Sequence, residues 1–176
     1  SAAVLGADGE SLQPGVVHGN AGYVAGVSGQ ALNVTRHAYD QVTACEFSAL
    51  PAIDCNAGTL SFWFKPHWKE SDEGIRRIIY LSAGQDFRIY MVKNKQQHID
   101  TSVNAPKQIQ ILSKDIFRQD EWTHVALSWD TSKAQVLLYI NGLEVGNKAV
   151  PECFLHIPKP RKPVMWLGES SADRFQ

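Results

Sequence analysis

The sequence has little cysteine and no long hydrophobic run. Its 176 residues include Cys45, Cys55 and Cys153, an odd number that cannot all pair within one chain. None of the three has the CxxC spacing of a zinc or redox site. No stretch of about 18 apolar residues occurs, so the sequence predicts no membrane-spanning helix.

Charge of either sign is also not in excess. Seventeen basic and eighteen acidic residues leave a formal net charge of −1. Proteins that bind nucleic acid through its phosphates carry a broad basic surface, so we expect no nucleic-acid partner. With 44% hydrophobic and 20% charged residues, the chain has the composition of a folded domain rather than of a disordered segment.

The cysteines leave three arrangements open. Cys45 and Cys55 could close a short loop, or one of them could pair with Cys153. In the third arrangement all three are small buried thiols. The cellular compartment therefore does not follow from the cysteines.

Helical periodicity is almost absent, whereas strand patterns follow one another along the chain. The clearest runs from Gly58 to Pro66, with Leu60, Phe62 and Phe64 on one face and Ser61, Trp63 and Lys65 on the other. Such alternation indicates a strand with one buried face. Further strands are predicted at 78–82, 87–92, 97–103, 109–112, 122–129, 135–140, 143–145 and 164–167.

Turn residues separate these strands. Asn141-Gly142 between two apolar runs is the typical sequence of a two-residue hairpin turn. Residues 1–35 are rich in glycine and are expected to form loop and short edge strand, and the prolines of 151–163 predict an extended surface loop. Many short strands with turns between them predict an all-β fold of two sheets, a sandwich or jelly roll.

Five segments, in the same order, resemble those of laminin-G-like domains. They are Gly26-Val-Ser-Gly-Gln-Ala-Leu32, Thr59-Leu-Ser-Phe-Trp-Phe-Lys-Pro66, Glu121-Trp-Thr-His-Val-Ala-Leu-Ser-Trp-Asp130, Leu138-Tyr-Ile-Asn-Gly-Leu-Glu-Val145 and Trp166-Leu-Gly-Glu169. The fold that this resemblance implies is the antiparallel two-sheet jelly roll of the concanavalin A-like lectins and glucanases. Pentraxins share the Trp-Asp and Asn-Gly features.

Two departures from the laminin-G-like pattern concern the ends. The family's final I-D-x-[VI]-x-[IV]-[YF] strand and its aromatic first strand have no counterpart here. We therefore expect residues 1–176 to be a single laminin-G-like domain that lacks its usual terminal strand or strands and is part of a larger protein. An open sheet edge of this kind invites a strand from a partner chain or a downstream domain.

No catalytic motif is apparent. Glycosidases with this fold need two carboxyl groups close together, and the acidic run Glu70, Asp72 and Glu73 lies in a polar loop that is predicted to be a solvated turn. His124, within a strand, is expected to be a buried histidine with one hydrogen-bond partner. Calcium is the ion that the resemblance implies, although loop aspartates commonly form turns instead. The candidates are Asp8, Asp40, Asp54, Asp86 and Asp130.

Sugar binding requires flat aromatic surface together with planar hydrogen-bonding groups. The side chains that alternation directs away from the core are Trp63, Arg88, Tyr90, His98, Asp100 and Tyr139, with Trp68 as a loop wall. Four of them, on two successive strands, are expected to form one patch on the outer, concave face: Arg88, Tyr90, His98 and Asp100. Alternatively, Arg88 and Asp100 form a cross-strand ion pair, and Trp63 and Tyr139 merely cover the sheet. A basic cluster, Lys159, Arg161 and Lys162, is a second candidate, for an acidic glycan.

The sequence therefore predicts a non-catalytic recognition module of a secreted or cell-surface protein. Its expected partner is a carbohydrate or glycoprotein. One alternative is a protein–protein adhesion or structural domain that a partner strand completes. The other is a polysaccharide-active enzyme.

Overall fold

The computed structural model describes residues 15–34, 43–48, 54–83, 87–96, 98–104, 108–113, 117–149 and 163–168. All regular elements within these ranges are β-strands, and every strand pair is antiparallel. The same ranges contain no helix that is long and apolar enough to cross a membrane. The strands are β1 (Val16–His18), β2 (Gly22–Ala25), β3 (Gln30–Asn33), β4 (Ala44–Phe47), β5 (Ala57–Phe64), β6 (Arg76–Ser82), β7 (Arg88–Lys93), β8 (Ile99–Asn104), β9 (Gln108–Leu112), β10 (Thr123–Asp130), β11 (Gln135–Ile140), β12 (Leu143–Ala149) and β13 (Val164–Gly168).

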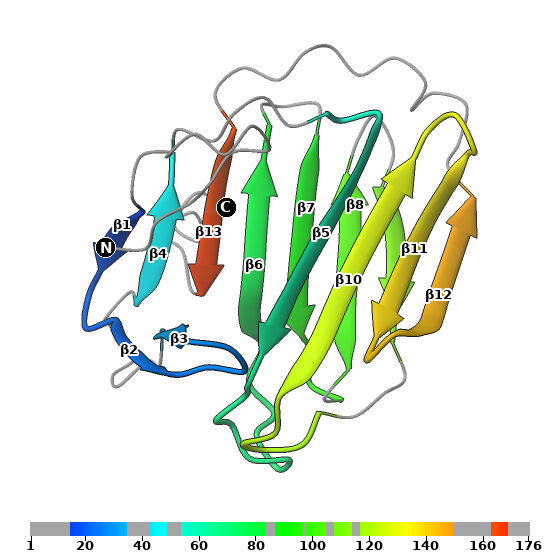
Figure 1. The fold of residues 1–176 in the computed structure, drawn as a ribbon. Helices are drawn as coiled ribbons and strands as arrows, with labels where there is room; N and C mark the ends of the chain where they lie inside the picture. Colours follow the sequence, from blue (N-terminus) through cyan, green and yellow to red (C-terminus); the bar gives the residue numbers. More distant parts are fainter. Residues whose placement is uncertain are drawn as a thin grey trace.

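The strands form two sheets and a separate hairpin. The larger sheet has the order β1-β4-β13-β6-β7-β8-β9, and the smaller has the order β12-β11-β10-β5. Figure 1 shows the four-stranded sheet in front of the strands β6 to β9 of the larger one. Strands β2 and β3 pair only with each other. The predicted all-β, two-sheet antiparallel sandwich is confirmed.

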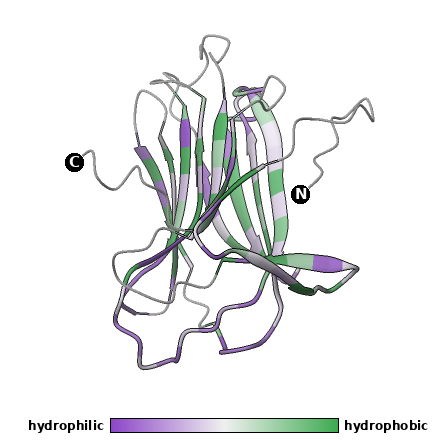
Figure 2. Ribbon diagram, turned by 90° about the vertical axis from the view of Figure 1, so that its left-hand side faces the viewer, coloured by the Kyte–Doolittle hydropathy of each residue, from purple (hydrophilic) through white to green (hydrophobic). Residues whose placement is uncertain are grey.

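The core lies between the two sheets and follows from alternation. Along β10 every second residue is buried, so that Val125, Leu127 and Trp129 face inward. Ile89 and Met91 of β7 are both fully buried in the same core. Figure 2 shows this pattern as hydrophobic and hydrophilic residues that alternate along the strands. Strands such as β9, β10 and β11 therefore bury one face and leave the other more exposed.

The Asn-Gly turn between β11 and β12 has the predicted geometry. Asn141 and Gly142 have φ angles of 51° and 80°, both in the left-handed region that a type I′ turn requires. The Asn141 side chain also accepts a hydrogen bond from the backbone N–H of His124, at 2.9 Å. The turn thereby ties the β11–β12 hairpin to the start of β10.

Two glycines permit close packing in the core. A Cβ atom at Gly58 of β5 would overlap the indole ring of Trp129, and one at Gly146 of β12 would overlap the side chain of Ile111 on β9. Because Ile111 belongs to the other sheet, Gly146 allows the two sheets to approach at this end.

A buried lysine holds the loop between β5 and β6. Lys93 of β7 is fully buried, and its ammonium donates to the carbonyl oxygens of Asp72 and Gly74, the latter at 2.7 Å. Desolvation lowers the pKa of Lys93. Asp72 is also anchored, since its carboxylate accepts from Gly74 N at 2.8 Å and from Arg76 Nη2 at 2.8 Å. This loop was expected to be a solvated turn, and the buried Lys93 holds its backbone in place.

Cys45 of β4 and Cys55 are both buried, and no disulfide joins these two described cysteines. The expected alternative of a Cys45–Cys55 bond is therefore wrong. Cys153 lies outside the described residues. Strand β4, which is only four residues long, is not among the strands predicted from the sequence.

Candidate functional site

One line of side chains crosses the outer face of the seven-stranded sheet. The register pairs Glu46 with Trp166, Trp166 with Tyr80, Tyr80 with Tyr90, and Tyr90 with Ser102. Three neighbouring strands, β13, β6 and β7, thus each contribute one aromatic ring at the same level. We call Trp166, Tyr80 and Tyr90 the aromatic row. All three side chains are half-buried.

Polar and charged groups fix the rings of the aromatic row. The Arg77 guanidinium lies 4.9 Å from the ring centroid of Tyr90 and 5.9 Å from that of Tyr80, and it donates to the Tyr90 hydroxyl at 3.2 Å. At the other end the His18 ring stacks on Trp166 at 5.0 Å. His18 Nε2 lies 3.0 Å from Glu46 Oε2.

The row continues into amide and hydroxyl groups on β8 and β9. The Gln110 amide donates to both carboxylate oxygens of Asp100, at 2.9 and 2.8 Å. Gln108 donates to the Ser102 hydroxyl at 3.0 Å. Both glutamines are exposed. Planar groups of this kind, next to flat rings, are what a sugar-binding surface needs.

The structure brings part of the predicted patch together. Tyr90, Arg88 and Asp100 occupy the same outer face by alternation, and Tyr90 belongs to the aromatic row. Arg88 lies opposite Asn104, whereas Asp100 lies opposite Val92. The two charged residues are therefore not cross-strand neighbours, and the alternative of an Arg88–Asp100 cross-strand ion pair is wrong. His98 precedes β8, where its backbone N–H donates to Asn94 Oδ1 at 3.1 Å.

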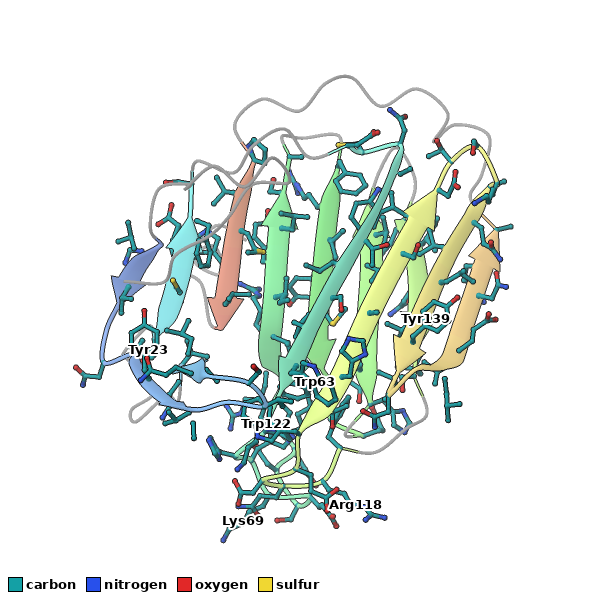
Figure 3. All side chains as sticks on the ribbon, viewed as in Figure 1. Tyr23, Trp63, Lys69, Arg118, Trp122 and Tyr139 are labelled. Atoms are coloured by element: carbon teal, nitrogen blue, oxygen red, sulfur yellow. The ribbon has the colours of Figure 1, made fainter. Side chains whose placement is uncertain are left out.

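Trp63 and Tyr139 lie on the opposite side of the sandwich. They belong to β5 and β11 of the four-stranded sheet and point away from the core (Figure 3). Trp63 is 51% exposed. The predicted ligand-binding residues are thus divided between two faces.

Trp68 lies at the end of the core instead of on either face. Its ring contacts Phe64 at a centroid distance of 5.4 Å, and the Lys93 ammonium lies 5.8 Å from the ring. Its indole N–H is buried and has no hydrogen-bond partner among the described residues.

The expectation of a buried His124 is wrong. His124 is only half-buried, on the outer face of β10. Its ring packs against Trp63 at 5.1 Å. The expected single partner is present, because His124 Nε2 lies 2.8 Å from Ser61 Oγ.

Two of the five aspartates proposed as calcium ligands, Asp54 and Asp130, lie in the described ranges, and both act as turn residues. Asp54 Oδ1 accepts from Asn56 N at 2.8 Å. Hydrogen bonds from Ser132 and Lys133 lower the pKa of Asp130 to about 2. Nowhere in the described ranges do three His, Cys, Asp or Glu side chains gather as a metal site. Asp8, Asp40 and Asp86, and the basic cluster Lys159, Arg161 and Lys162, lie outside the described residues.

Carboxylates on the described part of this outer face are far apart. Glu46 and Asp100 belong to β4 and β8, which are four strand positions apart in the sheet. At ~4.8 Å per strand this is a separation of roughly 19 Å. Glycosidases need their two carboxyl groups about 5 to 9.5 Å apart. These two residues therefore cannot act as such a pair.

Sequence reasoning missed Trp166, Tyr80 and Arg77 as site residues. Alternation within 78–82 places Tyr80 on the outer face, so that signal was available. Trp166 is 86 positions further along the chain, and only the order β13-β6 brings it beside Tyr80. No local pattern predicts that order.

Comparison with known proteins establishes the class of this fold. A laminin G family model, described as the concanavalin A-like lectin/glucanases superfamily, matches residues 38–176. The chain belongs to this family. No curated protein matches the sequence.

Solved structures share the fold at low sequence identity. Domain 4 of AbnA, an extracellular arabinanase of Geobacillus stearothermophilus solved with arabinotriose, is 17% identical with a TM-score of 0.62, over 89% of this chain and 73% of that one. The binding domain of botulinum neurotoxin DC, solved with SialylT, is 16% identical with a TM-score of 0.68, over 95% and 40%. The endo-β-1,3(4)-glucanase SCLam is 11% identical with a TM-score of 0.51, over 73% and 53%. This chain spans about half or less of the last two.

Proposed function

We propose that this domain is a non-catalytic carbohydrate-recognition module and that it binds glycans on the outer face of the seven-stranded sheet. The observation that carries the proposal is the aromatic row. Trp166, Tyr80 and Tyr90 come from three adjacent strands. The planar guanidinium of Arg77 contacts the two tyrosine rings, and the Gln110–Asp100 pair lies further along the same face on β8 and β9.

The chemistry of this face suits sugar rings. Aromatic faces pack against the apolar side of a sugar, while amide, carboxylate and guanidinium groups bond its hydroxyls. Gln110 and Asp100 lie at one end of the row and Glu46 at the other. Domain 4 of the arabinanase, which shares the fold, was solved with arabinotriose.

The absence of catalysis is part of the proposal. It is supported by the wide separation of Glu46 and Asp100 on this face. It is also supported by the loop carboxylate Asp72, which is engaged by Gly74 and Arg76. A binding module of this family would serve in a secreted or cell-surface protein, with a carbohydrate or glycoprotein as partner.

The test is affinity for a panel of oligosaccharides. Tyr90→Ala removes one ring of the aromatic row and should lower affinity for the bound glycan about tenfold, equivalent to ~1.4 kcal/mol. Isothermal titration calorimetry measures this loss.

Tyr90→Phe is the matched control, because it keeps the ring and removes only the hydroxyl that accepts from Arg77. It should lose much less affinity than Tyr90→Ala. Equal affinity of wild type and Tyr90→Ala for every bound glycan would show that glycans do not bind on the outer face of the seven-stranded sheet.

The alternative function, a domain completed by a partner strand, has one observation in its favour. Within the described residues β5 ends the four-stranded sheet. A hollow of about 230 Å³ lies beside it, lined in part by Leu60, Leu81, Trp129 and Met165. This reading predicts that the isolated chain binds none of the oligosaccharides.

A further inference from the structure

The outer face of the four-stranded sheet has its own exposed aromatic ring. Trp63 of β5 is 51% exposed although it is paired within the sheet, opposite His124 and one residue from the end of the strand. The His124 ring supports one side of it at 5.1 Å and is held in turn by Ser61. An indole that is fixed from one side and open on the other is a platform for stacking.

Small residues, most of which carry a hydroxyl group, continue from this platform along β5 and β10. The next pair on the same face is Ser61 with Ala126, and the one after it is Thr59 with Ser128. None of these side chains is larger than threonine, so they form a shallow strip of surface beside Trp63. We call this strip, Ser61, Ala126, Thr59 and Ser128, the path. From Trp63 to Thr59 the path is roughly 14 Å long at ~3.4 Å per residue, a length that several sugar rings in a row can fill.

A hollow lies at the far end of this path. It has a volume of about 350 Å³, within the size range of small-ligand sites. Its lining is rich in hydroxyl, amide and charged groups: Thr59, Ser128, Asp130, Lys133 and Gln135. Leu137 and Tyr139 of β11 border the path along its side.

The position of the charges indicates what the path binds. Asp130 and Lys133 in the hollow neutralise one another, with Nζ and Oδ2 3.1 Å apart. The side chains that lie between the hollow and the Trp63–His124 pair, Ser61 and Ala126, are uncharged. The surface thus offers an aromatic ring and hydroxyl groups, but no net charge for an ionic ligand.

We propose that this face is a second carbohydrate site, which binds an uncharged oligosaccharide from the Thr59–Ser128 hollow to the Trp63 platform. The inference extends the proposed function, because one domain would hold two glycan chains on opposite faces. A protein ligand is disfavoured, since a protein interface covers about 800 Å² per partner and centres on enclosed anchors, whereas Trp63 lies beside a narrow path.

The experiment compares stoichiometry and affinity in four variants. Wild type, Trp63→Ala, Tyr90→Ala and the double variant are titrated with gluco-, xylo-, manno- and galacto-hexasaccharides by calorimetry. We expect two sites per wild-type chain, one in each single variant and none in the double variant. For Trp63→Ala, binding at the four-stranded face should weaken at least tenfold.

Two further variants show whether a loss of binding comes from the removed group or from misfolding of the variant. Tyr23→Ala removes another exposed aromatic ring, 43% exposed on β2, that lies on neither face, and it should bind as wild type does. Thr59→Val keeps the shape of the hollow and removes one hydroxyl, so it should weaken the same site as Trp63→Ala. Circular dichroism checks that each variant is folded.

Each outcome separates the two proposals. If Tyr90→Ala abolishes all binding and Trp63→Ala changes nothing, the proposed function holds and this inference is wrong. The exposed indole of Trp63 then either contacts a protein or binds nothing. If only Trp63→Ala loses binding, the second site holds and the seven-stranded face is not the glycan site. Binding of no hexasaccharide by the wild type overturns both.

Discussion

At the scale of the residue, Asp72 is held in the charged state by its surroundings. Its partial burial by itself raises the pKa, but the hydrogen bonds from Gly74 and Arg76 and the positive charges of Arg76 and Lys93 outweigh this, and the pKa of Asp72 is lowered. A carboxyl group with a lowered folded-state pKa stabilises the fold above its unfolded pKa of ~3.9. That stability is lost as the pH falls through the folded pKa.

We therefore expect Asp72→Asn to lower the free energy of unfolding at pH 7 by about 1–2 kcal/mol, since charge-assisted hydrogen bonds are lost at a partly exposed site. The difference from wild type should shrink below about pH 4, because Asp72 of the unfolded chain becomes protonated there, before the folded-state carboxylate does. Urea denaturation between pH 3 and 7 measures it. Glu73→Gln, an exposed neighbour in the same loop, should leave the pH profile unchanged. A difference that is the same at pH 3 and pH 7 would contradict the assignment.

At the scale of the element, the β11–β12 hairpin depends on two residues with positive φ. Gly142, at φ 80°, has no heavy atom within 4 Å of the position of an added Cβ, so a substitution there tests backbone strain alone. Gly142→Ala should lower the free energy of unfolding by about 1 kcal/mol.

Gly22→Ala on β2 is the matched control, because its added Cβ also meets nothing within 4 Å and its φ is not positive. It should change the free energy of unfolding by less than ~0.5 kcal/mol. Equal effects of the two substitutions, measured by urea denaturation, would show that the left-handed conformation is not what constrains this turn.

At the scale of the whole molecule, both sheets share one core, which includes Cys55, while Cys45 is buried on the seven-stranded sheet. Burial raises the pKa of Cys45, and burial together with the nearby charge of Asp54 raises the pKa of Cys55 to about 11. Since the thiolate is the reactive form, both thiols should resist iodoacetamide in the native protein at pH 8.

Both thiols should become reactive in the same urea transition, because neither sheet can keep its inner face buried without the other. Mass analysis of the peptides that contain Cys45 and Cys55 follows each one separately. If one thiol reacts well below the midpoint of the other, the two sheets do not unfold as a cooperative unit.

The sequence by itself determined most of the strands, the buried faces of the long ones and the Asn141-Gly142 turn. These depend on alternation with a period of two and on local backbone preferences, which are written in neighbouring residues. It also determined that Tyr90 and Trp63 point away from the core. Only the tertiary structure decided that Trp166 lies beside Tyr80, and that Trp63 and Tyr90 lie on opposite sides of the sandwich. Strand order and sheet assignment arise from packing between segments far apart in the chain, which no local pattern records.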